Sequence, residues 1–271
     1  MKYFVLITGL IVFAGCNGKN TGINPENNLN KYPAKLNYRW EYSTTMSNEF
    51  YDNTGSIDSI QRTNLPNTTV KISSVNDSLP GYKNLIKIDA YNDDSPGSVS
   101  ENWYINDDTV FSIIAYRNAG SSYPIIPKPS NKRHLTLAEF KEICQNLTFN
   151  FRINSNYADS VRYFDPPRVV LRYPLYPGAE WNELQTPFYR DRVVKGTVSL
   201  KVNNVYYNCF IVEADMPELK LKMIDYISYK AGLLKREISS DSVALVSINS
   251  PDSAIRYLRG HDVSILVNKN F

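Results

Sequence analysis

The chain has 271 residues, of which 42% are hydrophobic and 21% are charged, and this balance excludes a disordered tail. Its 30 basic and 27 acidic residues leave a formal charge of +3, which is too little for a nucleic-acid-binding protein, so we expect no nucleic-acid partner. The 20 tyrosines outnumber the 11 phenylalanines and 3 tryptophans together, and such aromatic residues favour strands over helices.

The first fifteen residues have the composition of a signal peptide. Lys2 supplies a positive charge, residues 3–12 are an apolar run, and Ala14 and Gly15 are the small residues that a peptidase needs beside its cut. The apolar run is shorter than the roughly 20 residues that a membrane-spanning helix needs. We therefore expect residues 1–15 to be removed after export.

The stretch Phe13-Ala14-Gly15-Cys16 resembles the lipobox of bacterial lipoproteins. This resemblance implies that the Cys16 thiol carries diacylglycerol and anchors the mature chain in a membrane of the bacterial cell envelope. Residues 17–31 are polar, with six Asn and one Pro, so residues 16–35 are predicted to be the lipidated Cys and a flexible tether. In some lipoproteins an acidic run after the lipidated Cys resembles a signal for display outside the cell. No such run follows Cys16, so we expect an outer-membrane anchor facing the periplasm.

From Leu36 onward the hydrophobic pattern has the period of two that is typical of strands. The clearest pair is residues 194–202 and 205–213, because Asn203-Asn204 between them tolerates the positive φ of a tight hairpin. Val194, Val198, Leu200 and Val202 are expected on one face of the first of these strands. Further strands are predicted at residues 37–43, 69–75, 84–91, 103–105, 110–116, 221–229, 233–238 and 261–267.

One segment departs from this pattern. Residues 118–134 contain three Pro and form an irregular connection, and Thr136 with Glu139 then makes a capping box. Apolar residues at i, i+3, i+4 and i+7 follow, so residues 136–147 are predicted to be an amphipathic helix. We expect residues 36–271 to form a single β-rich domain, a strongly curved antiparallel sheet that makes a half-barrel or an open barrel, with this helix on its concave side.

The segment from Arg172 to Trp181, "RYPLYPGAEW", contains a Pro177-Gly178 turn. Together with the hairpin at 194–213 and "YISYKAGLLKREI" at 226–238, it resembles envelope lipoproteins whose sheets form an open half-barrel of the lipoprotein-carrier type. The resemblance implies an apolar hollow that holds acyl chains. We expect the hollow to be lined by Trp40, Trp103, Trp181 and Tyr207.

Chemical motifs are absent from the sequence. No metal-binding or nucleophile motif occurs, and His134 and His261 are far apart, so we expect no catalytic residue, no metal and no cofactor. Cys144 and Cys209 remain once Cys16 is lipidated. They are either a disulfide bridge or two separate buried thiols.

Three functions follow from these observations. The first is a non-enzymatic lipoprotein that binds or carries an apolar ligand or a partner protein, because residues 205–212 are apolar on both faces. The second is a glycan-binding module, which needs exposed Tyr and Trp platforms. The third is a hydrolase with dispersed catalytic residues, which needs a cleft that assembles them.

Overall fold

The computed structural model describes residues 30–118, 160–185, 189–217, 220–247 and 250–271. They form one sheet of 12 antiparallel strands in the order β6-β5-β4-β3-β2-β1-β12-β11-β10-β9-β8-β7. The strands are β1 (Arg39–Tyr51), β2 (Ile57–Leu79), β3 (Tyr82–Asn92), β4 (Ser100–Asn106), β5 (Val110–Asn118), β6 (Arg162–Arg172), β7 (Glu180–Leu184), β8 (Arg190–Val202), β9 (Val205–Met216), β10 (Leu221–Ser228), β11 (Gly232–Ser247) and β12 (Ser250–Lys269).

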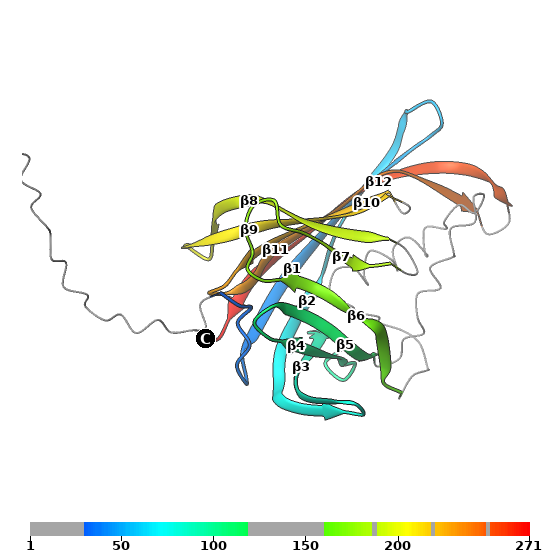
Figure 1. Cartoon of the computed structure of the whole chain (residues 1–271). Helices are drawn as coiled ribbons and strands as arrows, with labels where there is room; N and C mark the ends of the chain where they lie inside the picture. Colours follow the sequence, from blue (N-terminus) through cyan, green and yellow to red (C-terminus); the bar gives the residue numbers. More distant parts are fainter. Residues whose placement is uncertain (1–29, 119–159, 186–188, 218–219, 248–249) are drawn as a thin grey trace, which may run out of the picture.

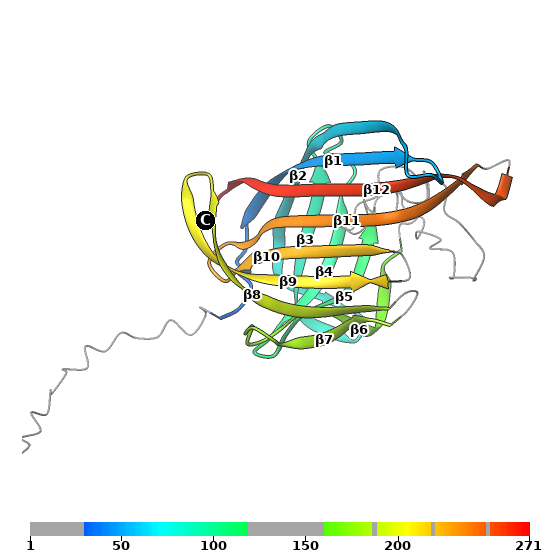
Figure 2. The same cartoon turned by 90° about the horizontal axis from the view of Figure 1, so that it is seen from above.

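The sheet curves until its two edges meet, so that it forms a nearly closed barrel (Figures 1 and 2). The edge strands are β6 and β7, and side chains connect them across the seam. The Trp181 Nε1 atom donates a hydrogen bond to the Val169 carbonyl oxygen at 3.0 Å, and Arg168 forms an ion pair with Glu183 at 2.5 Å. The ring is therefore completed by side-chain contacts between β6 and β7, while β1 and β12 are joined by a regular ladder.

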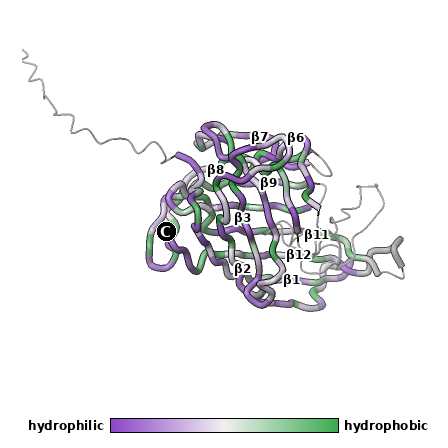
Figure 3. The backbone as a smooth tube through the Cα atoms, turned by 90° about the horizontal axis from the view of Figure 1, so that it is seen from below, coloured by the Kyte–Doolittle hydropathy of each residue, from purple (hydrophilic) through white to green (hydrophobic). Residues whose placement is uncertain are grey.

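Alternation along the strands separates the inner wall of the barrel from the outer wall. In β1, the side chains from Trp40 to Phe50 at even-numbered positions are buried, and those at odd-numbered positions between them are mostly polar and at least partly exposed. Hydrophilic and hydrophobic positions alternate in the same way along the strands in Figure 3. This arrangement follows from the period of two, which sends neighbouring side chains to opposite faces of a sheet.

Apolar side chains fill the barrel in two clusters. One surrounds Trp40, Phe111, Trp181 and Leu234, and the other lies around Phe50, Met223 and Leu258. A third, smaller cluster lies around Trp103 and Ile114 on the opposite side of β4 and β5 from the residues that face the interior. Polar side chains lie between these two inner clusters, in the middle of the barrel.

Several local expectations from the sequence are confirmed. Asn203 and Asn204 both have positive φ and join β8 to β9. Gly178 has φ 88° and follows Pro177, and the Ala179 amide donates to the Tyr176 carbonyl oxygen, as in a type II turn. Val198, however, is 37% exposed, because the ladder shifts register between Val194 and Gly196.

The curved antiparallel sheet predicted from the sequence is confirmed. Of the two predicted shapes, it goes beyond the half-barrel, because it curves until it is nearly closed and the Arg168–Glu183 and Trp181–Val169 contacts connect its edges. The predicted helix at 136–147 and the Pro-rich connection at 118–134 lie outside the described residues, except for Asn118 at the end of β5. Residues 1–15 and most of the predicted tether also lie outside them.

Candidate functional site

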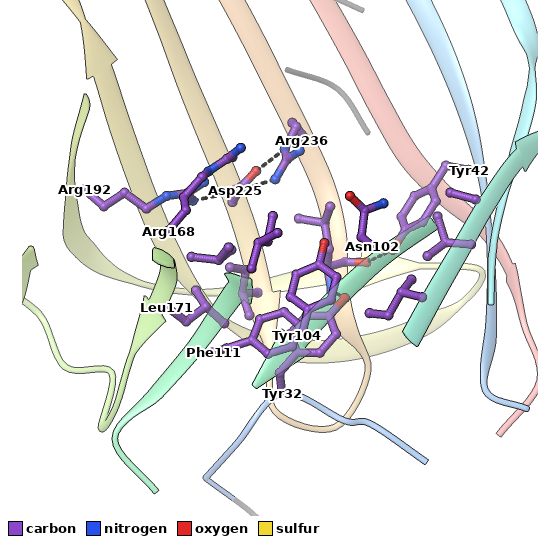
Figure 4. Close-up of a pocket in the computed structure, with 17 residues that line it drawn as sticks. Tyr32, Tyr42, Asn102, Tyr104, Phe111, Arg168, Leu171, Arg192, Asp225 and Arg236 are labelled. Carbon is purple, nitrogen blue, oxygen red and sulfur yellow. Dashed lines mark hydrogen bonds and ion pairs between the residues drawn. The ribbon is translucent and has the colours of Figure 1, made fainter. Parts of the chain in front are cut away.

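A cavity of about 110 Å³ lies inside the barrel, and both halves of the sheet contribute to its walls (Figure 4). One part of the lining is charged and comes from β6, β8, β10 and β11. Another part is aromatic and comes from the segment before β1, from β1, and from the β4–β5 hairpin. The remaining wall consists of Asn102 and the aliphatic residues Val70, Ile88, Ala90, Ile113, Val170, Leu171, Ile227 and Leu233.

The charged part belongs to a chain of ion pairs that we call the charged belt: Arg168, Glu183, Arg190, Arg192, Asp225 and Arg236. Glu183 accepts hydrogen bonds from Arg168 at 2.5 Å and from Arg192, and it forms an ion pair with Arg190 at 3.1 Å. Arg192 also reaches Asp225 at 2.8 Å, and Arg236 pairs with Asp225 through its Nε atom at 2.5 Å. The belt thus connects β6 and β7 at the seam to β8, β10 and β11.

The belt keeps its carboxyl groups ionised in spite of their burial. Burial alone raises the pKa of Glu183, but Arg168, Arg190 and Arg192 lower it further than burial raises it. The pKa of Asp225 is lowered in the same way by Arg236 and Arg192 against the effect of burial. Burial and the neighbouring Arg168 hold the pKa of Arg190 well below its ordinary value. The surroundings in the belt therefore favour the ionised forms of both carboxyl groups and disfavour the charged form of Arg190.

Three aromatic rings stack below the belt. Phe111 lies between Tyr32 and Tyr104, with ring centroids 4.8 Å and 4.6 Å away and each pair within 7° of parallel. Tyr32 is held in this stack because its amide donates to the Tyr173 hydroxyl at 2.8 Å and its carbonyl oxygen accepts from Asn106 Nδ2 at 3.0 Å. The segment that precedes β1 thereby covers this end of the cavity (Figure 4).

Close packing at Gly232 also fixes the position of Tyr32. Gly232 has φ 75°, and a Cβ atom there would lie 2.9 Å from the Tyr32 ring and 3.3 Å from Trp40 Nε1. A residue with a side chain would be strained at that φ and would collide with the ring. The turn between β10 and β11 therefore needs glycine to let Tyr32 enter the barrel.

Three polar groups face the cavity without a hydrogen-bond partner among the described residues. The side-chain Oδ1 atom of Asn102 is unsatisfied, and the residue is only 3% exposed. Arg168 donates from Nε to Glu183, and no hydrogen bond from its Nη atoms is found in the described part of the chain. The Tyr104 hydroxyl also lacks one there, and burial raises its pKa to about 12, so it is a neutral donor at pH 7. These groups can bind a polar atom placed between them.

The four aromatic residues expected to line a hollow lie elsewhere. Trp40 is fully buried beside the cavity and donates from Nε1 to the Ala231 carbonyl oxygen at 2.7 Å. Trp103 faces away from the cavity and donates to Asp77 at 2.8 Å, and Trp181 closes the seam. Tyr207 lies near Lys269 on β12. None of the four is among the side chains that line the cavity, and the indole NH of each of the three tryptophans is bound in the wall.

The cysteines were expected to serve as an anchor and as a bridge or two thiols. Cys209 is a buried free thiol on β9, and burial raises its pKa to about 11. Cys16 and Cys144 lie outside the described residues. Lipidation at Cys16 and the pairing of Cys144 with Cys209 therefore stay predictions.

A pattern in the sequence indicates the charged belt, although the predicted site residues did not include it. Val194 is buried, and the period of two counted back from it reaches Arg192 and Arg190, which are both 1% exposed. Asp225 lies between the buried residues Met223 and Ile227 in the same way. Charged side chains at positions with buried parity indicate a polar interior.

Two other features are absent from the described part of the chain. Its residues contain no helix with the length and apolar character needed to span a bilayer. No three His, Cys, Asp or Glu side chains in this part come together as a group that could hold a metal ion.

Comparisons with known proteins add no relative to this picture. Neither the protein-family models, nor the curated proteins, nor the solved structures contain a match to this chain.

Proposed function

We propose that this chain is a non-enzymatic binding protein of the bacterial cell envelope, moored through a lipid on Cys16, that holds a small ligand inside its barrel. The observation that carries the binding proposal is the buried side-chain Oδ1 atom of Asn102, which faces the cavity and has no hydrogen-bond partner among the described residues. Buried polar atoms are almost always hydrogen-bonded, so an unsatisfied one needs an explanation. A bound ligand that donates to Asn102 supplies it.

The size and lining of the cavity refine the apolar ligand predicted from the sequence. An engineered cavity of about 150 Å³ takes benzene, whereas this cavity measures about 110 Å³. Its wall combines aliphatic side chains with Asn102, Tyr104 and three arginines. These features support a small amphipathic molecule rather than a long acyl chain or a partner protein.

The ligand is tested by native mass spectrometry of the chain purified from the cells that make it. We expect a small molecule to leave the protein on collisional activation. Ala90→Leu, which adds side-chain volume to the cavity wall, should abolish this mass difference. Ala214→Leu adds the same volume in the other inner cluster and should keep it. A ligand that survives Ala90→Leu but not Ala214→Leu contradicts the proposed location.

The anchor is tested separately by metabolic labelling with a fatty-acid probe. We expect the label on the native chain and its loss in Cys16→Ser. An unlabelled chain that accumulates in the cytosol contradicts the envelope part of the proposal, while the cavity experiment remains valid. The glycan-binding and hydrolase alternatives stay predictions.

A further inference from the structure

We infer that one end of the barrel rests on the anionic surface of the bilayer in which the Cys16 lipid is inserted. This inference rests on the proposed function, because it needs that anchor, and it adds an orientation that the anchor alone does not impose. We call this end of the barrel the tether end. It consists of residues 30–39, 79–82, 106–110, 172–180, 201–206, 228–232 and 267–271.

The chain enters the barrel at the tether end. Tyr32 is bound there by the Tyr173 hydroxyl and by Asn106, so the entry point is fixed to the wall. Figure 2 shows the first described residues, the β8–β9 hairpin and the end of β12 at this same end. Asn30 follows Cys16 by 14 positions, a stretch that spans at most about 50 Å. A lipid on Cys16 therefore holds the entry point within this distance of the bilayer.

The tether end exposes large apolar side chains. Tyr206 in the β8–β9 hairpin is 69% exposed, and Val205 beside it is 50% exposed. Other exposed side chains come from separate segments of the same end: Leu36, Tyr176 and Phe271. Tyrosine has an apolar ring and a polar tip, which is why it is enriched at the level of lipid headgroups. Because these side chains are distributed around one rim, they suit a broad membrane surface.

The tether end is also basic, which favours an anionic surface. It contains seven basic and three acidic side chains, namely Lys31, Lys35, Arg39, Arg172, Lys201, Lys230 and Lys269, and Asp107, Asp108 and Glu180. Two of the acidic groups have partners inside this end, because Asp107 accepts from the Thr109 amide and Asp108 pairs with Lys31. Each basic side chain close to an anionic bilayer raises the affinity roughly fivefold.

The opposite end of the barrel has the reverse charge in two of its connections. Residues 52–56, between β1 and β2, and residues 93–99, between β3 and β4, contain Asp52, Asp93 and Asp94 and no basic residue. An anionic bilayer would repel these connections. The distribution of charge therefore selects the same end of the barrel as the position of the tether.

Basic and aromatic groups lie side by side at the tether end. The Lys201 Nζ atom is 5.7 Å from the centre of the Tyr206 ring, and the Lys269 Nζ atom is 4.0 Å from that of Phe271. Such a pair presents a positive charge and an apolar ring at the same height above the barrel. The charge can contact a headgroup phosphate while the ring enters the interfacial layer.

The test uses the full chain, purified from the cells that make it and reconstituted through its anchor into vesicles of brominated lipids. The vesicles contain either phosphatidylcholine alone or an equal mixture with phosphatidylglycerol, and bromine quenches tryptophan emission only at short range. Tyr206→Trp places a reporter at the tether end. Ile60→Trp, at a 54% exposed position on β2 that pairs with Glu49, is the matched reporter away from it. The native chain measures the background, since its three tryptophans are at most 6% exposed.

We expect the Tyr206→Trp reporter to be quenched at least about threefold more than the Ile60→Trp reporter, because only the tether end meets the headgroups. This difference should be larger in the vesicles that contain phosphatidylglycerol. Equal quenching of the two reporters, or stronger quenching of Ile60→Trp, would overturn the orientation. Quenching that is independent of phosphatidylglycerol would overturn the role of anionic headgroups.

Failure of the anchor has a different signature. A chain that takes up no fatty-acid label and does not float with the vesicles has no lipid anchor, and then the envelope part of the proposed function and this inference both fall. A chain that floats with the vesicles but leaves both reporters unquenched keeps the anchor and overturns only the inference.

A single charge substitution tests the basic rim. In the Tyr206→Trp chain, Lys230→Gln should lower the ratio of docked to undocked protein on phosphatidylglycerol vesicles about fivefold. Arg62→Gln, on β2 away from the tether end, is the matched control and should leave the ratio unchanged. Both side chains are exposed, so neither substitution removes buried packing. A ratio that Lys230→Gln does not change would overturn the contribution of the basic rim.

Discussion

Among the described residues, three carboxyl groups point into the barrel, and the two regions in which they lie shift the pKa of these groups in opposite directions. Glu183 and Asp225 belong to the charged belt, where arginines lower the pKa of both. Asp262 lies on β12 between Met46 and Ile238 of the neighbouring strands. No hydrogen bond or ion pair to it is found in the described part of the chain, and burial raises its pKa to about 7.

This difference teaches that burial alone does not decide the charge of these groups. All three side chains are at most 6% exposed, so the loss of hydration acts on each of them. What separates them is the presence of guanidinium groups within hydrogen-bond distance. In the belt, Glu183 and Asp225 are therefore ionised, and Glu183 forms an ion pair across the seam. On β12, burial favours the neutral form of Asp262.

The largest expected effect comes from removing the negative charge at the centre of the belt. Glu183→Gln leaves Arg168, Arg190 and Arg192 around a neutral amide, and the free energy of unfolding at pH 7 should fall by about 3–5 kcal/mol. Urea denaturation at pH 7 measures this loss. A denaturation midpoint equal to that of the native chain would mean that the ion pairs do not hold β6 and β7 together.

Asp262→Asn should have the opposite sign and depend on pH. Because the folded pKa of about 7 is above the unfolded value near 4, the stability that the neutral carboxyl contributes is complete below pH 4 and is lost as the pH rises towards 7. The variant should match the native chain at pH 4 and be about 2–4 kcal/mol more stable at pH 8.

Urea denaturation at pH 4, 6 and 8 checks this dependence. Asp215→Asn, at an exposed position on β9, is the control variant in the same experiment. If Asp262→Asn is destabilising at pH 8, the carboxylate has a partner there and the contrast with the belt disappears.

The smallest effect is expected for an ion-pair group on the outer wall. Glu213 pairs with Lys222 at 2.9 Å and Lys195 at 3.4 Å, and the two lysine side chains are about half exposed. Glu213→Gln should change the free energy of unfolding by no more than about 1 kcal/mol, and 0.5 M salt should reduce even that. A loss as large as that of Glu183→Gln, measured in the same urea experiment, would remove the distinction between inner and outer ion pairs.

Local features of the fold could be predicted because their causes are local. The Asn203-Asn204 turn and the alternation on both sides of it indicate a hairpin in any context. The β6 strand was missed because Pro166 and Pro167 argue against a strand. In the structure β6 is an edge strand whose ladder shifts register between Ile113 and Ala115, so these prolines remove no pairing that a central strand would need.

The candidate site could not be predicted in the same way, because its residues lie far apart in the sequence. Arg168, Arg192, Asp225 and Arg236 come from four strands, and only the closure of the sheet brings them together. Parity along β8 and β10 identifies the charges that point inward, but not their partners. The predicted lining residues Trp40 and Trp103 bind the wall through their indole NH groups, whereas smaller residues such as Asn102 face the cavity.

The pairing of β1 with β12 has a consequence for how the chain is made. Thr44 and Ser264 face each other in this ladder although they are 220 residues apart. One edge of β1 therefore has no strand to pair with until β12 has been synthesised, an interval of roughly 10–45 s at ordinary elongation rates. During that time the nascent polypeptide presents an open strand edge, which is a template for intermolecular aggregation unless a chaperone covers it.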